Sequence, residues 1–275
     1  MTIARTERYE FAASVRGAVE RHPAGDPWRP GASADDRSPP LREALIGLGW
    51  EEIGRDAELL AFAAPAAQEL GRVFAPLNLV DMLLGGALAA DGYAQYAGEG
   101  DRLVELDGRR LRFSRATELE PVGYVDALAV HVVRAASPES TIDGDKAAVR
   151  RDAWIAASVG YLAGLAAEAL RLASDHAKSR VAFGRPLAAL DPIQQHLANA
   201  ATLADGVALL ADELVTPAGL AHSGHAAFGA AAICQQVVGA IGFTLEFPLQ
   251  RAFRRAKTMQ SWSDAAVIAM GEGRK

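Results

Sequence analysis

Two stretches of helical periodicity in this sequence are separated by a short turn, which reads Arg180-Val181-Ala182-Phe183-Gly184-Arg185-Pro186. Arg180 and Phe183 are three residues apart, so a helix end would project both side chains from one face. A guanidinium group suits a phosphate, and an aromatic ring suits a flat ring system. The pairing therefore fits a dinucleotide. On these residues alone the structural alternative is favoured, in which Arg180 caps a helix end and Phe183 fills the core.

The stretches around this turn predict a helical C-terminal domain. Helical periodicity runs from 153 to about 182. Asp191-Pro192-Ile193-Gln194 supplies an N-cap acid, a proline for the first helical position and a glutamine for a capping box. The next helix should therefore run from 192 to about 215, and two more are expected at 221–238 and 248–262. Four helices in this order predict an antiparallel four-helix bundle within residues 150–275.

A second turn follows about fifty residues after the first and reads Gln236-Val237-Val238-Gly239-Ala240-Ile241-Gly242-Phe243-Thr244. Glycines at a helix exit let the backbone approach a ligand closely, and Gln236 offers both a donor and an acceptor. Either turn alone is a common way to end a helix. Their order and spacing together indicate a ligand site.

The sequence before residue 150 predicts three segments. Residues 1–37, with many prolines and glycines from His22 onward, predict an extended arm. Ser38 before two prolines predicts the start of the first helix, and further helical patterns at 56–72 and 76–96 give a helical domain over 38–97. Asp107-Gly108 between two short apolar runs predicts a hairpin, and another strand is expected at 127–133. With loops at Ser137-Pro138 and Asp143-Gly144, residues 98–149 predict a reduced β segment in a mainly α fold.

The composition argues against several classes of function. The chain has 275 residues and a net charge of −6, so no nucleic acid is expected as a partner. Cys234 is the only cysteine, and His222 with His225 lacks a third ligand, so no disulfide and no metal site are expected. The uncharged stretch 214–245 is long enough to cross a bilayer, yet its proline, histidines and glutamines predict a buried helix with no membrane. The start of the sequence, without an apolar segment, predicts the cytoplasm.

With both turns in view, the sequence resembles the acyl-CoA dehydrogenase family over about residues 153–262, the region of that family's C-terminal helical domain. The resemblance implies FAD as the cofactor and an α, β, α order of domains. It implies that Arg180 faces the FAD pyrophosphate, that Phe183 packs near the cofactor, and that Gln236 with Gly239 lines its adenosine half. In the family these residues reach across a dimer interface to the neighbouring subunit's FAD, so the cofactor would be shared.

The sequence departs from the family where the reaction needs a base. Family members remove the α-proton of an acyl-CoA thioester with a carboxylate while hydride leaves the β-carbon for the flavin. The usual position of that carboxylate falls on Ser263, and the alternative one falls at about Trp154. Asp264, beside Ser263, is therefore only a weak candidate for a catalytic residue. The middle segment also lacks the family's Thr-Glu and Gly-Ser-Asp strings, so we do not expect it to hold a flavin by itself.

This asymmetry resembles the shortened subunit of heteromeric acyl-CoA dehydrogenases of the actinobacterial, steroid type. The resemblance implies a full-length acyl-CoA dehydrogenase partner in an α2β2 heterotetramer. It also implies introduction of an α,β double bond into an acyl-CoA, with a steroid side-chain CoA as the expected substrate and an inactive isolated chain. Two alternatives stay open: a self-sufficient homomeric dehydrogenase that uses Asp264, and a non-enzymatic scaffold that has lost the cofactor.

Overall fold

The computed structural model describes residues 4–23, 38–122, 130–213 and 216–271. The N-terminal part contains α1 (Arg5–Arg21), α2 (Pro39–Gly47), the 3-10 helices η1 (Trp50–Gly54) and η2 (Ala57–Phe62), α3 (Ala63–Arg72) and α4 (Asn78–Asp81). The strands are β1 (Ala87–Ala90), β2 (Tyr93–Gln95), β3 (Arg102–Asp107), β4 (Arg110–Val122) and β5 (Val130–Ile142). The C-terminal part contains α5 (Gly144–Ser179), β6 (Val181–Ala182), β7 (Arg185–Pro186), η3 (Leu187–Ala189), α6 (Asp191–Asp212), α7 (Pro217–Val238), η4 (Gly239–Phe243) and α8 (Leu249–Ala269).

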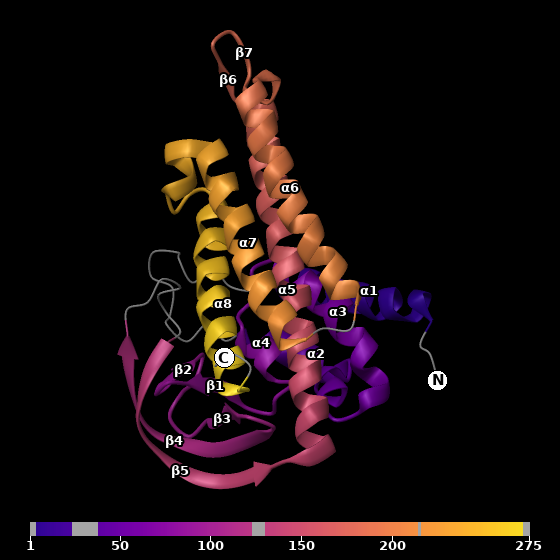
Figure 1. Ribbon diagram of the computed structural model, residues 1–275, viewed down its shortest axis with the longest axis vertical. Coiled ribbons are helices and arrows are strands. Elements are labelled where there is room, and N and C mark those ends of the chain that lie inside the picture. The colour runs from indigo at the N-terminus through magenta and orange to yellow at the C-terminus, as the bar shows by residue number, and fades with distance from the viewer. Residues whose placement is uncertain (1–3, 24–37, 123–129, 214–215, 272–275) are drawn as a thin grey trace.

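The four long C-terminal helices lie side by side along the long axis of the molecule, and successive helices run in opposite directions (Figure 1). The long helix predicted from residue 153 begins already at Gly144 and is continuous to Ser179. All its residues from 153 to 166 are buried, because α3 covers one side of this half and the other C-terminal helices cover the rest. This stretch is therefore buried more completely than the part of α5 that follows it, where only Ala169, Ala173 and Ala177 are buried.

Glycines allow α3 and α5 to approach until their backbones touch. A Cβ added at Gly160 would lie 2.1 Å from the Ala64 oxygen, and one at Gly164 would lie 2.0 Å from the Gln68 oxygen. The relation is reciprocal, since a Cβ at Gly71 would lie 2.0 Å from the Tyr161 oxygen. A side chain cannot be accommodated at such distances, so these positions fix how the N-terminal helices sit on α5.

The ends of the other C-terminal helices differ in detail from the sequence prediction. The prediction of a capping box at the start of α6 is wrong, because Leu190 occupies the N-cap position. The Gln194 amide instead donates to the Ala188 oxygen at 2.9 Å. α7 begins at Pro217, earlier than predicted, since the Thr216 hydroxyl caps it by accepting from the Gly219 N–H at 3.1 Å. α8 continues beyond the predicted end at 262 to Ala269.

Within the part of the chain that the structure describes, two helical stretches are long and apolar enough to cross a membrane by length and composition, Gly144–Ser179 and Pro217–Phe243. In the first, 78% of the most apolar window is buried inside the protein, which is the behaviour of a core helix. In the second only 50% is buried, so the prediction of a helix buried on most sides holds in part. Part of its surface faces outward and is available for contacts.

The N-terminal part corrects two predictions. The extended arm at 1–37 is wrong for residues 5–21, which form α1 and pack on α3, where Arg16 donates two hydrogen bonds of 2.9 Å to Glu69. Residues 24–37 lie outside the described residues. The helix predicted at 76–96 shrinks to α4, and the residues beyond it form β1 and β2 instead. The helix start after Ser38 is confirmed.

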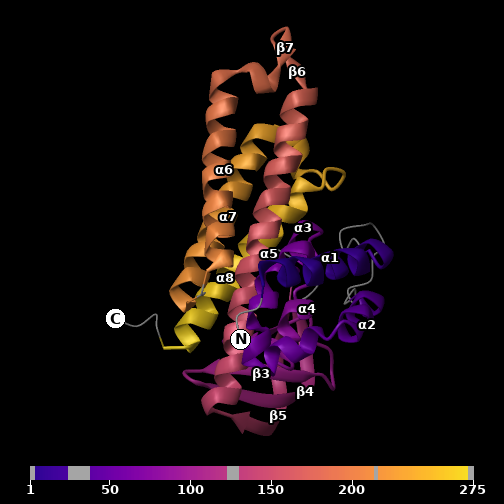
Figure 2. The same ribbon diagram turned by 90° about the vertical axis from the view of Figure 1, so that its right-hand side faces the viewer.

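Strands β1 to β5 close into a barrel in the order β1-β2-β5-β4-β3. The barrel lies at the opposite end of the molecule from the β6–β7 hairpin (Figures 1 and 2). The hairpin around Asp107-Gly108 is confirmed, with Asp107 paired to Arg110 across the β3–β4 turn. The loop predicted at Ser137-Pro138 is wrong, because β5 passes through both residues and pairs with β4, with a register shift between Phe113 and Ser114 that accommodates the proline. The predicted strand start at 127–129 lies outside the described residues. The β segment thus extends back to residue 87 and forms a small closed barrel.

Candidate functional site

The first predicted turn is an exposed hairpin beyond the end of α5. Arg180 is the C-cap of that helix, and its N–H donates to the His176 oxygen at 2.8 Å while its carbonyl accepts from the Leu187 N–H at 2.8 Å. Phe183 and Gly184, with φ of 54° and 77°, form the two central positions of the β6–β7 turn, a geometry typical of tight hairpins. Phe183 is 91% exposed, so the structural alternative that buries it in the core is wrong.

The second predicted turn ends α7. Gln236 is exposed, and Gly239 has a φ of 74°, where glycine is favoured, with open space on the side where a Cβ would stand. Gln235 was missed by the sequence analysis. It is buried, and its amide donates to the Gly242 oxygen at 2.6 Å across the turn, which fixes the η4 segment relative to α7. Only the fold distinguishes the roles of the two neighbouring glutamines.

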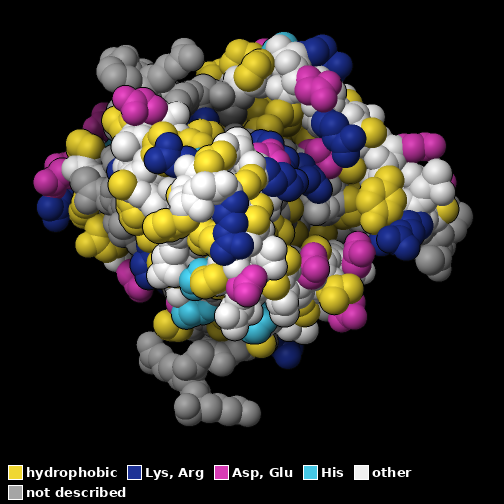
Figure 3. Space-filling model, turned by 90° about the horizontal axis from the view of Figure 1, so that it is seen from above, with side chains coloured by type: hydrophobic (Ala, Val, Ile, Leu, Met, Phe, Trp, Pro, Cys, Tyr) yellow, Lys and Arg dark blue, Asp and Glu magenta, His cyan; other side chains and the backbone are white. Residues whose placement is uncertain are grey.

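Both turns lie at the same end of the molecule (Figure 1). The His176 and Phe247 rings meet edge to face with centroids 5.6 Å apart, which joins the end of α5 to the segment after η4. We call the exposed hydrophobic side chains of the two turns the apical apolar surface; they are Val181, Phe183, Ile241, Phe243 and Leu245. Figure 3 looks down on this end and shows hydrophobic and basic side chains interspersed. The four residues predicted to bind FAD are thus brought to one end, where their own chain leaves the side chains of Arg180, Phe183 and Gln236 exposed.

Asp264 lies elsewhere, on α8. Its carboxylate is 3.2 Å from His225 Nε2, and His225 Nδ1 is 2.7 Å from the amide of Gln260. Ser263, at the usual position of the family's base, is buried. The structure therefore places Asp264 against a histidine of α7. Among the described residues no group of three histidine, cysteine or acidic side chains could hold a metal.

Trp154, at the alternative position of the base, contacts a carboxylate that the sequence analysis missed. Its indole N–H donates to Asp81 at 3.0 Å, and Asp81 also accepts from the Gln95 amide at 3.0 Å and from the Leu88 N–H at 3.2 Å. Burial raises the pKa of Asp81 to about 7, against the opposing effect of these hydrogen bonds. The carboxylate is enclosed, so it joins α4, β1 and α5 rather than facing a substrate.

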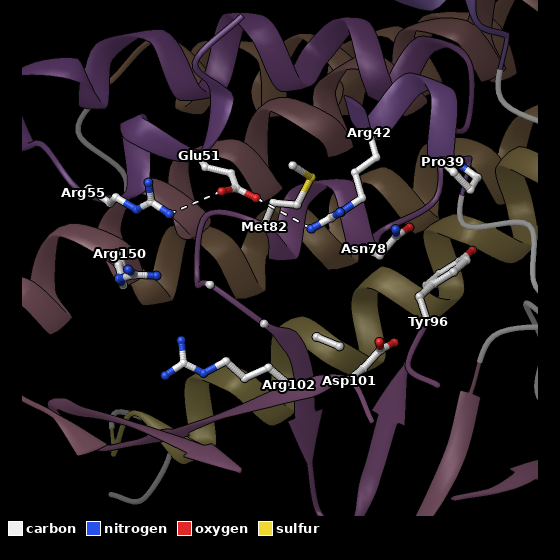
Figure 4. A pocket seen from close by; sticks show the side chains of 13 residues that line it. Pro39, Arg42, Glu51, Arg55, Asn78, Met82, Tyr96, Asp101, Arg102 and Arg150 are labelled. Carbon is white, nitrogen blue, oxygen red and sulfur yellow. Dashed lines mark hydrogen bonds and ion pairs between the residues drawn. The ribbon is translucent and has the colours of Figure 1, made fainter. Parts of the chain in front are cut away.

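A cavity of about 420 Å³ opens between the N-terminal helices, the barrel and the start of α5 (Figure 4). Its charged lining residues are Arg42, Glu51, Arg55, Asp101, Arg102 and Arg150. None of the predicted site residues lines it. The sequence analysis missed this cavity, because its arginines lie on α2, β3 and α5 and just after η1, and they share no motif.

The comparisons with known proteins come from sequence and from structure. Residues 156–263 match the family model described as the acyl-CoA dehydrogenase C-terminal domain. An acyl-CoA dehydrogenase of Bacillus subtilis (strain 168) is 34% identical over 121 residues, which are 38% of this chain and 31% of that relative. The chain thus matches about a third of the length of this curated relative.

Solved structures match nearly the whole chain. A variant of the Tcur3481-Tcur3483 steroid ACAD has a TM-score of 0.70 at 16% identity and covers 98% of this chain and 96% of its own. The ChsE4-ChsE5 complex from Mycobacterium tuberculosis has a TM-score of 0.68 at 14% identity and covers 98% and 97%. Glutaryl-CoA dehydrogenase from Mycobacterium smegmatis has a TM-score of 0.63 at 17% identity and covers 98% and 94%.

The fold is therefore that of acyl-CoA dehydrogenases. The family model, the curated relative and the structural neighbours together support the acyl-CoA dehydrogenase family, as the sequence of the two turns indicates.

Proposed function

We propose that this chain is a subunit of an FAD-dependent acyl-CoA dehydrogenase and completes the FAD site of a full-length partner. The observation that carries the proposal is the exposure of both turns at one end of the molecule. Phe183 is 91% exposed on a hairpin that projects beyond the helix ends, and Gln236 is exposed on α7. An exposed aromatic side chain with an arginine and a surrounding apolar surface is typical of a contact site on another chain.

The chain's own residues would each bind one part of the cofactor. The Arg180 guanidinium would pair with the pyrophosphate, where a bidentate, charge-assisted contact is strongest. Phe183 would pack near the cofactor, and Gln236 with the Gly239 backbone would line the adenosine half. Gln235 would hold the second turn in place through its hydrogen bond to Gly242. Bound FAD supplies the hydride acceptor of the reaction.

The chain offers no carboxylate in register for the proton-transfer half of the reaction, so the partner would supply the base. Ser263 is a buried alcohol at the usual position, and Asp264 is held by His225 on the α7–α8 surface. A general base has to reach the substrate proton within hydrogen-bond distance. We therefore assign removal of the α-proton to the partner and expect the isolated chain to be inactive.

For the assembly and the substrate, we extend the proposal by analogy with the similar structures. Two of the similar structures are a steroid ACAD and a complex of two named chains, ChsE4 and ChsE5. By analogy we propose an α2β2 heterotetramer in the cytoplasm that acts on a steroid side-chain CoA and introduces an α,β double bond. This step rests on likeness of fold and is the part of the proposal that substrate screening has to test.

The test is co-expression of the chain with full-length acyl-CoA dehydrogenases, followed by the visible spectrum and FAD content of the purified complex. Arg180→Ala and Gln236→Ala should each lower the FAD content. Arg171→Ala is the matched control, because this arginine also lies on α5 but is paired with Glu168 and Asp175 on its outer face. Unchanged FAD in the first two variants would support a scaffold without cofactor contacts. A yellow, dye-reducing isolated chain would support the homomeric enzyme that uses Asp264.

A further inference from the structure

The cavity between the N-terminal helices and the barrel concentrates positive charge in an acidic protein. Four arginines and two carboxylates line it, whereas the whole chain carries a net charge of −6. The arginines come from α2, the residue after η1, β3 and α5, so they are brought together only by the fold. A surplus of cations in a concave site raises the local concentration of anions.

Among the residues that line the cavity, Arg150 has the surroundings that most strongly indicate a bound anion. Its Nη1 donates to the Leu84 oxygen at 2.8 Å, and among the described residues it forms no ion pair with a carboxylate. A Cβ at Gly85 would lie 2.1 Å from this Nη1, so the glycine leaves the space that the guanidinium occupies. Burial lowers the pKa of Arg150, and the positive charges of Arg55 and Arg102 lower it further. An anion placed among these groups would relieve that repulsion.

The neighbouring arginines are held in position by other contacts. Arg55 forms ion pairs with Glu51 and Glu52 at 3.3 Å and 2.5 Å. The Arg102 guanidinium lies 4.0 Å from the centroid of the Phe113 ring and pairs with Glu139. Such contacts reduce the loss of side-chain entropy on binding, because the groups are already ordered.

The cavity has two chemically different ends (Figure 4). Arg55, Arg102 and Arg150 lie toward one end, and Tyr96 and Asn78 lie toward the other. The first end fits the oxygens of a phosphate, which guanidinium groups bind with paired hydrogen bonds. The second end offers an aromatic ring and an amide for an uncharged ring system. The volume of the whole cavity, about 420 Å³, lies within the range of small-molecule sites.

We propose that this cavity binds a phosphorylated small molecule of nucleotide size, with the phosphate at Arg55, Arg102 and Arg150 and the remainder directed toward Tyr96. The site is separate from the apical turns, because no residue of either turn lines the cavity. The proposal therefore stands or falls independently of the shared FAD site.

Isothermal titration calorimetry of the full chain with ADP, pyrophosphate and adenosine tests it. We expect ADP to bind, adenosine to bind at least tenfold more weakly, and ADP affinity to fall with salt because the contact is ionic. Arg150→Gln should weaken ADP binding by about tenfold to a hundredfold, the effect of losing a hydrogen bond from a charged group. Arg134→Gln is the matched control, since Arg134 is an exposed arginine of β5 paired with Glu120 and does not line the cavity.

Arg55→Gln provides a second variant that does not depend on how Arg150 contributes to folding, because the Arg55 side chain is 48% exposed. It should weaken ADP binding in the same direction. The proposal is overturned if ADP does not bind, if adenosine binds as tightly as ADP, or if the Arg55 and Arg150 variants bind ADP like the Arg134 control.

Discussion

The buried carboxylate of Asp81 predicts a specific dependence of stability on pH. Burial raises the pKa of Asp81 to about 7, while the unfolded chain should titrate it near the ordinary value for aspartate. The folded state therefore retains a proton that the unfolded state has lost, and the free energy of unfolding falls as pH rises. Above the folded pKa both states are ionised and the dependence ends.

The magnitude follows from the shift in pKa. A shift of about three pH units corresponds to about 4 kcal/mol between the two limits. Of this contribution to the free energy of unfolding, about 2.5 kcal/mol should be lost between about pH 5 and about pH 8. Gln95 accommodates the neutral acid, because its Oε1 is buried without a hydrogen-bond partner and can accept the carboxyl proton once the amide rotates.

Urea unfolding of the wild type and of Asp81→Asn over this pH range, followed by tryptophan fluorescence, measures the effect. As pH rises, the unfolding free energy of the wild type should fall by about 2.5 kcal/mol relative to that of Asp81→Asn. Trp154→Phe removes a donor that lowers the pKa of Asp81, so it should move the transition to higher pH. A difference between wild type and Asp81→Asn that stays constant with pH would refute the reasoning.

Three further predictions concern packing and the exposed turns. Gly160→Ala should lower stability by about 1 to 3 kcal/mol or prevent folding, because its Cβ meets the α3 backbone. Gly206→Ala on α6 is the control and should be neutral or stabilising, because the space at its Cβ is open. Equal melting temperatures of the two variants would contradict this. Arg16→Ala should cost about 1 to 3 kcal/mol, since it leaves the buried Glu69 carboxylate without its bidentate partner, and chemical denaturation will show whether the cost is smaller. Phe183→Ser should leave the stability of the isolated chain within about 0.5 kcal/mol while it weakens association with the partner, and a large loss of stability would mean that the ring is not free in solution.

Local signals in the sequence were sufficient where a turn or a cap decides the structure. Asp107-Gly108 predicts its hairpin because few residues accept the backbone of such a turn, and two prolines after Ser38 mark a helix start. The two turns with Arg180 and Gln236 were found for the same reason. Each is a short motif of consecutive residues, so it can be recognised without knowledge of the fold.

Non-local contacts account for what the sequence analysis missed. Residues 87–95 are alanine-rich and look helical, yet they form strands because β1 pairs with β3 and β2 pairs with β5, which lies far along the chain. α1 was missed because the proline-rich stretch after it dominated the interpretation of the whole segment. The arginine cavity and the Asp81 cluster depend on residues brought together by the fold, and no spacing in the sequence announces them.

Closure of the five strands has a practical consequence for handling the protein alone. β1 pairs with β3 and thereby completes the ring, so each of the strands β1 to β5 has a neighbouring strand on both sides and none of the five is an edge strand. If the chain is produced without a partner, we therefore expect precipitation to start at the apical apolar surface. Substitutions that raise solubility belong there, for example at Phe243 or Leu245.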